Sequence, residues 1–493
     1  MTVPFATIPQ NLRTPLFFVE FDNSMANTAT ATQRTLLIGQ MLDGAAGKDS
    51  IPERITSGMQ AAERFGRGSM LHTEADAYFR NDTAGEVWVL PLADTESQTA
   101  AAGKLKITSA ANDTGVISLY IAGIRVQMAV VDTDTEEVIA TGLAKVINRN
   151  VNLPVTAAAE ADTVTLTAKN KGAHGNGIDI RLNYLGLTGG ESTPSGFEMT
   201  VTAMSGGNGA PDLLNGLANL KDRSFDFIVN PYSDTASLDV VKTFLADRWA
   251  WDKQLYGHSY GVITGTYGQL ADLGEKRNDQ HASLLGVNGS PSPDYQWSAA
   301  YTGAIAQSLR NDPGRPLQTL VISGVLPPDD TKILELTERN NLLHSGISTF
   351  TVDDDGTVRV ENIITTYQKN AYGDNDDSYL QVETLYLLMF VSRYLRTQVT
   401  SKFGRMKLAN DGTRFAPGSA IVTPNIIKAE LIAQYGFLEF NGHVQDAKGF
   451  AAGLKVERNS QNPNRVDVLW TGTLINQLRV FALLNQFRLM PGN

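Results

Sequence analysis

Apolar segments of strand length alternate with helix-type segments in two separate parts of the chain, and this alternation limits the possible folds. Residues 35–41 and 86–92 have the composition of buried strands, and residues 53–66 and 70–80 between them have helical periodicity. The alternation returns later, with strands predicted at 224–232, 257–266, 281–287 and 317–325 and helices at 235–254, 268–278 and 295–312. Strands that alternate with helices form parallel sheets with helices on the faces. The sequence therefore predicts an α/β core.

The segment between these two parts, residues 96–207, has a different pattern. Short stretches rich in Thr, Val and Ile alternate between apolar and polar residues, as half-buried strands do. One amphipathic helix is predicted at 134–150, with Val138, Leu143 and Val146 at helical intervals. We expect a β-rich insertion domain here.

The region after residue 350 mixes helices and strands. Asp355 and Gly356 lie between two alternating runs, which is the pattern of a hairpin turn. Ser378 and Gln381 form a capping-box pattern at the start of a long helix. This helix is predicted to reach about Lys402 and to be buried in its middle, because its apolar residues face nearly all directions there.

Both ends of the chain contain short segments with strand-type alternation and two apolar faces, at residues 16–21 and 478–484. A strand of this kind exposes unpaired backbone groups unless it finds a partner. The partner is either the edge of the chain's own sheet or a strand of another chain.

Composition excludes several classes of protein. The chain has 493 residues, enough for about three domains, and its formal net charge of −11 argues against broad nucleic-acid binding. It contains no cysteine, which rules out disulfides, thiolate metal sites and cysteine nucleophiles. Residues 1–22 lack the pattern of a signal peptide, and the apolar run at 385–391 is too short to span a bilayer.

The sequence "GHSYG" at residues 257–261 matches the G-x-S-x-G nucleophile elbow and would make Ser259 a nucleophile. That motif requires a strand before the serine and a helix after it. Here the apolar run follows the motif, so the better interpretation is a strand with small residues.

Other ligand motifs lack essential residues. The loop at 43–50 resembles a P-loop, but Leu42 replaces its first glycine and Asp49 replaces the hydroxyl that binds magnesium. Thr351 and Asn362 stand where a calcium loop needs Asp and Glu. The six histidines include no i, i+4 pair. The acidic stretch 374–377 leaves open a weak surface cation site.

The stretch "KGAHGNGIDIRLNY", residues 171–184, contains Gly172, Gly175 and Gly177 before a strand pattern. This order reverses the dinucleotide-binding motif, and no helix follows that could hold a phosphate. We expect a tight turn in which glycine permits positive φ. No chemistry is assigned to His174.

Several stretches together resemble contractile-tail sheath proteins. "KGAHGNGIDIRL" at 171–182 resembles their G-x-x-G-N-x-I signature, and "IPQNLRTPLFFVEFDNS" at 8–24 is similar to the N-terminal arm of Mu-type bacteriophage tail sheaths. "RTLLIGQML" at 34–42 and "ERFGRGSML" at 63–71 match the same subfamily. The similarity extends over essentially the whole chain.

The resemblance implies a structural protein of the virion that is assembled in the host cytoplasm. Such subunits stack in rings around a rigid inner tube, form a helical sheath and contract to drive the tube through the host envelope. The implied fold has a subtilisin-like α/β core without protease activity, a β-rich insertion and extended terminal strands. No cofactor, metal or catalytic residue is implied.

The resemblance also implies that the terminal segments join neighbouring subunits in a shared sheet. The residues expected to link subunits are Leu16, Phe17, Phe18, Val19, Glu20, Phe21, Leu478, Arg479, Val480, Phe481, Ala482, Leu483 and Leu484. Lys428 is a candidate for contact with the inner tube. The implied partners are other copies of the chain, the inner tail tube protein, and the baseplate and tail terminator proteins, without direct nucleic-acid contact or membrane insertion.

Two alternatives remain open at this stage, a serine hydrolase that uses Ser259 and another self-assembling tail or baseplate component. The expected parts of the chain are an N-terminal arm at 1–35, an α/β core in two pieces at 36–95 and 208–350, the insertion at 96–207 and a C-terminal α+β domain at 351–493.

Overall fold

The computed structural model describes residues 33–489. These residues form two compact units, which we call the body (33–386 and 477–489) and the C-terminal unit (387–476). The predicted linking segment 16–21 lies outside the described residues.

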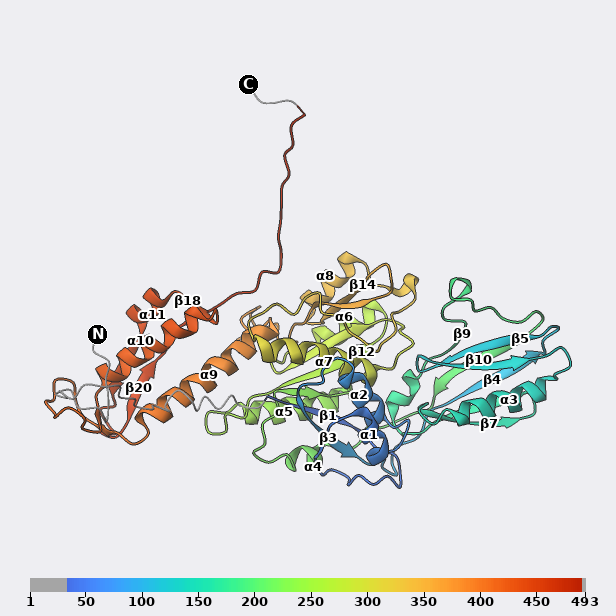
Figure 1. Cartoon of the computed structure of the whole chain (residues 1–493), viewed down its shortest axis with the longest axis horizontal. Helices are drawn as coiled ribbons and strands as arrows, with labels where there is room; N and C mark the ends of the chain where they lie inside the picture. The colour runs from blue at the N-terminus through green and yellow to red at the C-terminus, as the bar shows by residue number, and fades with distance from the viewer. Residues whose placement is uncertain (1–32, 490–493) are drawn as a thin grey trace, which may run out of the picture. The chain divides into compact units, whose positions relative to one another are not determined.

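A six-stranded sheet forms the centre of the body (Figure 1). Its strand order is β13-β12-β11-β1-β3-β2, and every neighbouring pair is parallel except β2 with β3. This confirms the predicted α/β class. The strands are β1 Arg34–Gln40, β2 Glu53–Ile55, β3 Glu86–Leu92, β11 Phe227–Val229, β12 His258–Thr264 and β13 Ala282–Val287.

Helices cover both faces of this sheet. On one face α2 and α7 contact the strands and each other, with α1 against α2. On the other face α4 and α5 bury apolar side chains against β1 and β11, and α6 and α8 do so against β12 and β13. The helices are α1 Gly58–Phe65, α2 Met70–Phe79, α4 Leu213–Ala218, α5 Thr235–Arg248, α6 Tyr267–Glu275, α7 Asp294–Asn311 and α8 Leu336–His344.

The five parallel strands have the doubly wound order 2-1-3-4-5 when numbered along the chain. The chain passes from β1 to β3 on one side and later enters β11 on the other side of β1. The carboxyl ends of β1 and β11 therefore form the switch point at which folds of this type usually bind ligands.

The predicted helix at 53–66 is partly wrong. Ser57 accepts a hydrogen bond from the Gln60 N–H and caps α1, so the helix begins only at Gly58. The residues before this cap are extended and add β2 to the edge of the sheet beside β3.

The strand predicted at 317–325 is also wrong. The Thr319 N–H donates to the Val360 carbonyl at 2.7 Å and the Ile322 N–H donates to the Val358 carbonyl at 2.9 Å. Between these bonds Thr319 has φ 65°, which a β-branched residue rarely adopts, and this kink interrupts a regular ladder. The neighbouring hairpin of β14 Thr349–Val352 and β15 Val358–Asn362 is as predicted, with Gly356 at φ 82° in its turn.

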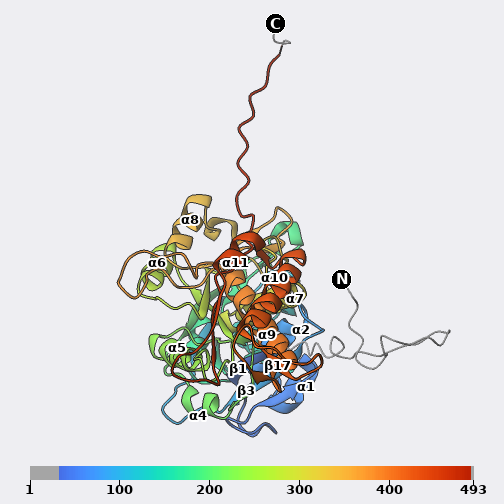
Figure 2. The ribbon, with the colours of Figure 1, turned by 90° about the vertical axis from the view of Figure 1, so that its left-hand side faces the viewer.

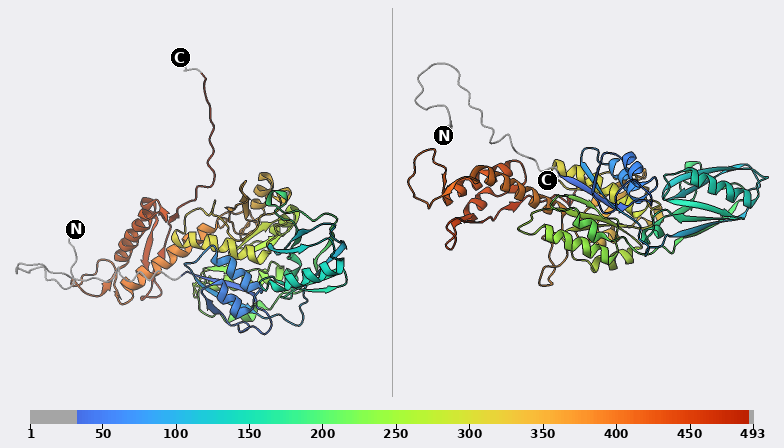
Figure 3. Two further views of the ribbon diagram at one scale, coloured as in Figure 1. Left: turned by 45° about the vertical axis from the view of Figure 1, so that its right-hand side comes forward. Right: turned by 90° about the horizontal axis from the view of Figure 1, so that it is seen from below.

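Residues 102–205 form two small antiparallel sheets around a hydrophobic core of their own. Helix α3 Glu136–Arg149 lies along one of them (Figure 3). Its buried face contains Ile139, Leu143 and Ile147, whereas Val138 is exposed, so the predicted apolar face was slightly rotated. The strands are β4 Ala102–Ser109, β5 Gly115–Ile121, β6 Ile124–Val130, β7 Val155–Glu160, β8 Thr163–Ala168, β9 Ile180–Leu182 and β10 Glu198–Ser205.

The long helix α9 Val382–Phe403 begins in the body and continues into the C-terminal unit. The buried stretch that the sequence predicts lies in the first half of α9, where Leu387 and Met389 are inaccessible to solvent, whereas Ser392 and Arg396 farther along are exposed. The predicted capping box is wrong, because Gln381 instead forms a β-bridge with Ile364 and the helix begins after it.

The C-terminal unit packs α10 Pro424–Phe440 and α11 Ala447–Gly453 with short strands around a small aromatic core. In this core the rings of Tyr435 and Phe450 stack at 3.8 Å between centroids. Its strands are β16 Lys407–Leu408, β17 Ile421–Val422, β18 Val444–Gln445, β19 Lys455–Arg458, β20 Val466–Leu469 and β21 Thr473–Leu474. Among residues 33–489, no helix is both long and apolar enough to cross a membrane.

Candidate functional site

The segment 477–489, which we call the C-terminal arm, is extended and contains neither helix nor strand (Figures 1 and 2). The sequence predicts that residues 478–484 form a strand with another copy; within the single chain the segment forms no strand, because none of the described strands pairs with it. A strand forms only when its backbone groups find a partner. The exposed large apolar residues of the arm are Leu478, Val480, Phe481, Leu483, Leu484, Phe487 and Leu489.

Continuous apolar exposure of this kind marks an interaction surface. Phe481 and Leu484 are 80% and 82% exposed, far above what a side chain in a folded core shows. Both faces of the arm are apolar, as the sequence predicted. The arm is therefore suited to insertion between other apolar elements.

The first residues of the arm contact the body. The side chain of Gln318 donates to the Leu478 carbonyl at 3.4 Å, and the Gln477 side chain donates to the Gly314 carbonyl at 3.4 Å. The Arg479 guanidinium forms an ion pair with Glu383. Sequence analysis placed Arg479 among the linking residues, but its side chain is only 16% exposed and lies against its own chain.

Lys428, the candidate for tube contact, is half-buried on α10. The sequence analysis missed the outward face of that helix, where Ile426, Phe437 and Phe440 are exposed. A helix with apolar residues on all sides is normally buried on all sides. Because this face of α10 is exposed in the single chain, it is available for a partner. Helical spacing of Ile426, Ala433 and Phe440 was the signal in the sequence that could have revealed it.

The C-terminal unit also differs from the rest of the chain in charge. Residues 387–476 contain eleven Lys and Arg against six Asp and Glu, a net charge of +5, whereas the whole chain carries −11. A basic unit in an acidic chain favours an acidic partner surface.

Ser259 has no catalytic surroundings. It is the second residue of β12 and is 2% exposed, so it does not occupy the turn that a nucleophile elbow requires. The adjacent His258 shares a hydrogen bond of 2.8 Å with Ser283. Because consecutive strand residues point to opposite faces, His258 cannot act as the base for Ser259.

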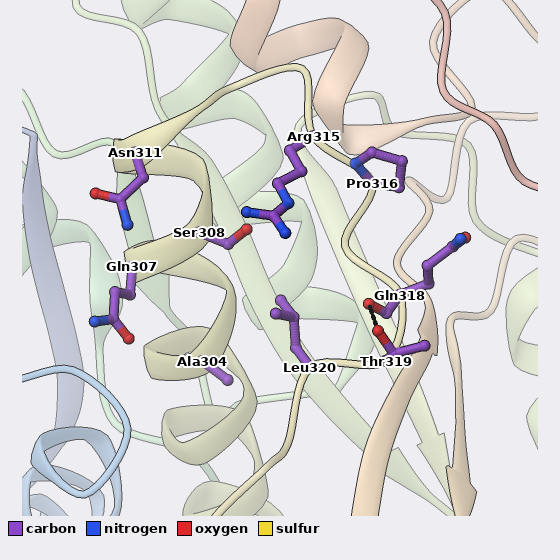
Figure 4. A pocket seen from close by; sticks show the side chains of 9 residues that line it. All are labelled: Ala304, Gln307, Ser308, Asn311, Arg315, Pro316, Gln318, Thr319 and Leu320. Atoms are coloured by element: carbon purple, nitrogen blue, oxygen red, sulfur yellow. Dashed lines mark hydrogen bonds between the residues drawn. The ribbon is translucent and has the colours of Figure 1, made fainter.

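An open pocket of about 420 Å³ lies between the last turns of α7 and the loop 315–320 (Figure 4). Arg315 and Ser308 point toward each other across it. The lining consists of amides, hydroxyls, aliphatic groups and one guanidinium, and it includes no Asp, Glu or His. The pocket therefore offers no general base to activate Ser308 or a water molecule.

The switch point of the sheet is filled by the chain itself. Asn170 donates to the Met41 carbonyl at 2.9 Å and accepts from the Met70 N–H at 3.0 Å, which joins the insertion to the end of β1 and the start of α2. The Lys171 N–H donates to Asp94 at 2.8 Å. Only about 10 Å³ of cavity remains beside Asn170 and His174, too little for an organic ligand.

The glycine-rich stretch is the turn that makes this junction. Gly172 has φ 121°, whereas Gly175 and Gly177 do not need positive φ, so the expectation holds for the first glycine alone. Residues Ala173–Gly177 form a 3₁₀ turn before β9. Burial lowers the pKa of His174 to about 4, so the ring is neutral near pH 7.

Buried carboxyl groups lie at the same edge of the sheet. Glu74 is inaccessible to solvent, and neither of its oxygens has a hydrogen-bond partner among the described residues. Burial, with a smaller contribution from Asp294, raises its pKa well above the usual range. Burial also raises the pKa of Asp294 to about 7. Within residues 33–489, no three His, Asp or Glu side chains are grouped as a metal site would require.

Two family models match the chain. The phage tail sheath protein central domain matches residues 206–366, and the phage tail sheath C-terminal domain matches residues 374–488. The Mu-like prophage FluMu tail sheath protein of Haemophilus influenzae is 42% identical over 489 residues, which cover 99% of this chain and 100% of that protein.

Solved structures of sheath tail proteins are also similar. The protein from Desulfitobacterium hafniense aligns with a TM-score of 0.49 and 15% identity over 94% of this chain and 97% of that chain. The protein from Listeria innocua aligns with a TM-score of 0.48 and 14% identity over 92% of this chain and 94% of that chain.

Proposed function

The chain belongs to the phage tail sheath proteins and is a structural component of a contractile phage tail, and we propose that its two terminal arms join it to neighbouring copies in the sheath. The observation that carries this proposal is the C-terminal arm, whose apolar residues are exposed and whose backbone lacks a partner strand among residues 33–489. The N-terminal segment 16–21 has the same two-faced pattern in the sequence.

The receiving element in our proposal is the hairpin of β19 and β20 in the C-terminal unit. Within the described chain these two strands pair only with each other, so each has an open outer edge. Val468 and Leu469 of β20 are also exposed. A two-stranded sheet is marginally stable alone, and an arm from another copy would extend it by β-augmentation.

This linkage suits a helical assembly. An arm that leaves one copy and pairs with a different surface on the next copy makes a heterologous contact, which repeats without closing. Hydrogen bonds between arms and hairpins can persist while the bodies rotate. Contraction then proceeds from an extended sheath that is kinetically trapped above the contracted state in free energy.

The C-terminal unit is our proposed contact with the inner tube. Its net charge of +5 and the exposed Ile426, Phe437 and Phe440 on α10 support this assignment. Lys428 follows Ile426 by two residues on α10, so at ~100° per residue it lies on the other side of the helix from this apolar face and remains a separate candidate contact. The baseplate and tail terminator proteins are proposed partners at the ends of the sheath, and assembly takes place in the host cytoplasm before the protein functions in the virion.

We also propose that the chain has a subtilisin-like core without enzymatic activity. Burial of Ser259 in β12 supports this proposal. A fluorophosphonate probe for active serines should not label the protein. Labelling that disappears in Ser259→Ala would instead support a hydrolase.

Residues 96–207 are proposed to be an inserted domain that faces outward on the sheath. Their separate hydrophobic core supports this division, as does the tolerance of surface positions for inserted segments.

Deletion of an arm tests the proposed linkage. Purified full-length protein should form long tubes that are visible by electron microscopy. Deletion of residues 1–22, or of 480–493, should abolish tube formation while circular dichroism shows a folded protein. Tubes of normal length from either deletion variant would contradict the proposed linkage by the deleted arm.

A further inference from the structure

An ion pair holds the C-terminal arm at the point where the arm leaves the body. The guanidinium of Arg479 donates to the Glu383 carboxylate and to Gln381 Oε1, the latter at 2.9 Å. The Glu383 side chain is inaccessible to solvent. Arg479 is the last residue of the arm with a described contact to the body, since every described residue after it is exposed.

The body orients Glu383 for this contact. Glu383 lies in the first turn of α9 and also accepts a hydrogen bond from the Leu317 N–H at 2.7 Å. Leu317 is buried and lies two residues before the strained Thr319. Such strain persists only where the surrounding structure holds a segment in place, so the loop that contacts Glu383 has a fixed conformation.

The same turn of α9 is tied to the start of β1, the first described strand of the chain. The Tyr386 hydroxyl donates to the Asp226 carbonyl at 2.7 Å, and the Asp226 N–H donates to the Arg34 carbonyl at 2.9 Å. A short chain of bonds therefore connects the root of the C-terminal arm with the start of β1.

We propose that Glu383 and Arg479 form a clasp that fixes the exit point, and hence the free length, of the C-terminal arm. This inference rests on the proposed linkage between copies. Arg479 is then a positioning residue for its own arm, while the apolar residues after it contact the neighbour.

The clasp determines how far the arm reaches. Nearby, the Gln477 side chain donates to the Gly314 carbonyl, Gln318 donates to the Leu478 carbonyl and Arg479 donates to Gln318 Oε1, each at 3.4 Å. In our proposal, loss of the ion pair frees the arm as far back as Ile475, whose N–H donates to the His443 carbonyl at 3.2 Å. Release of four residues would add about 13 Å of reach at ~3.3 Å per residue. A helical array with a uniform rise requires arms of uniform length.

Distances between spin labels on dilute, unassembled protein test the clasp directly. The chain has no cysteine, so Val480→Cys on the arm and Glu63→Cys on α1 introduce unique attachment sites. Arg479→Met should broaden the distribution of distances between the labels about twofold, because the spread of a flexible segment grows with the square root of its length. An unchanged width in Arg479→Met would overturn the proposal.

Two further variants complete the test. In the double variant Glu383→Gln with Arg479→Met, no lone charge is buried, so the protein folds even if Arg479→Met alone does not. The double variant should show the same broadening, and the wild-type width would contradict the clasp. Arg488→Met changes an exposed arginine on the same arm and should leave the width unaltered; equal broadening in this control would also contradict the proposal.

The test of the clasp and the test of the linkage between copies can fail independently. The label distances concern a single copy, whereas deletion of 480–493 concerns assembly. A truncated protein that still forms tubes would contradict the linkage and leave the clasp intact. If the truncated protein forms no tubes, but the label distances in Arg479→Met are as broad as in the wild type and no broader, the clasp alone is contradicted.

Discussion

At the residue scale, Glu74 is a buried carboxyl group without a hydrogen-bond partner among the described residues. Gly39 makes room for it, since a Cβ at that position would lie 2.5 Å from Glu74 Oε2. Burial of a charge costs more than burial of a neutral acid, so the folded protein favours the protonated form. Folding is then linked to pH through this group.

We predict that the free energy of unfolding falls less with rising pH in Glu74→Gln than in the wild type. The raised pKa means that the folded protein binds the proton more tightly than the unfolded chain, so stability falls as pH rises from the unfolded pKa toward the folded one. The amide has no such linkage, and the variant should gain about 2 kcal/mol over the wild type at pH 8. Urea unfolding at pH 5 and pH 8 measures this. If wild type and variant change equally with pH, Glu74 is not the group responsible; Glu63→Gln is the exposed control.

Asn170 is a second residue whose role depends on its surroundings. We predict that Asn170→Ala lowers the free energy of unfolding by about 2 kcal/mol, because the Met41 carbonyl and the Met70 N–H lose their partner in a buried site. The exposed control Asn425→Ala should change it by less than about 0.5 kcal/mol. Equal effects of the two substitutions would contradict a fastening role for Asn170.

At the element scale, the sequence predicts those segments well whose burial is determined locally. The spacing of apolar residues is clear in the strands β1, β3, β12 and β13 and in the buried first half of α9. Prediction from the sequence fails where a contact with a residue distant in the chain determines the local structure. The carbonyls and N–H groups of β15 determine the path of 317–322, and the pairing of Gln381 with Ile364 delays the start of α9.

For the C-terminal arm, too, the sequence does not reveal contacts with remote residues. Its two-faced apolar pattern is evident in the sequence, and our proposal that the segment links copies is based on this pattern. Its partner is not evident, because strand pairing joins residues that are remote in sequence or belong to another chain. The clasp was equally hidden, since nothing local to Arg479 indicates Glu383.

Proline substitutions in the arm distinguish backbone pairing from apolar contact. Adjacent strand residues direct their N–H groups to opposite edges, so Ala482→Pro and Leu483→Pro remove one donor from each edge. At least one of the two should reduce tube formation about tenfold or more, which corresponds to ~1.4 kcal/mol. Sedimentation of tubes measures the yield. Leu483→Ala shortens the side chain but keeps the backbone N–H donor, so it should give more tubes than the proline variant with the lower yield. Normal assembly of both proline variants would exclude β-augmentation at these residues.

At the scale of the whole molecule, we propose that the free energy for contraction is stored in the assembled subunits of the extended sheath. We predict that purified extended sheaths contract when warmed or treated with denaturant in the absence of nucleotide, with release of heat in a calorimeter. A requirement for ATP would contradict a sheath that is trapped in a high-energy state.

We propose above all that the C-terminal arm completes a sheet in a neighbouring copy. Cryo-electron microscopy of assembled tubes tests it most directly. We expect density for residues 478–484 as a strand hydrogen-bonded to the β19–β20 hairpin of another copy, with Arg479 still paired with Glu383 of its own chain. Density that places these residues against their own body, with both edges of the hairpin unpaired, would contradict it.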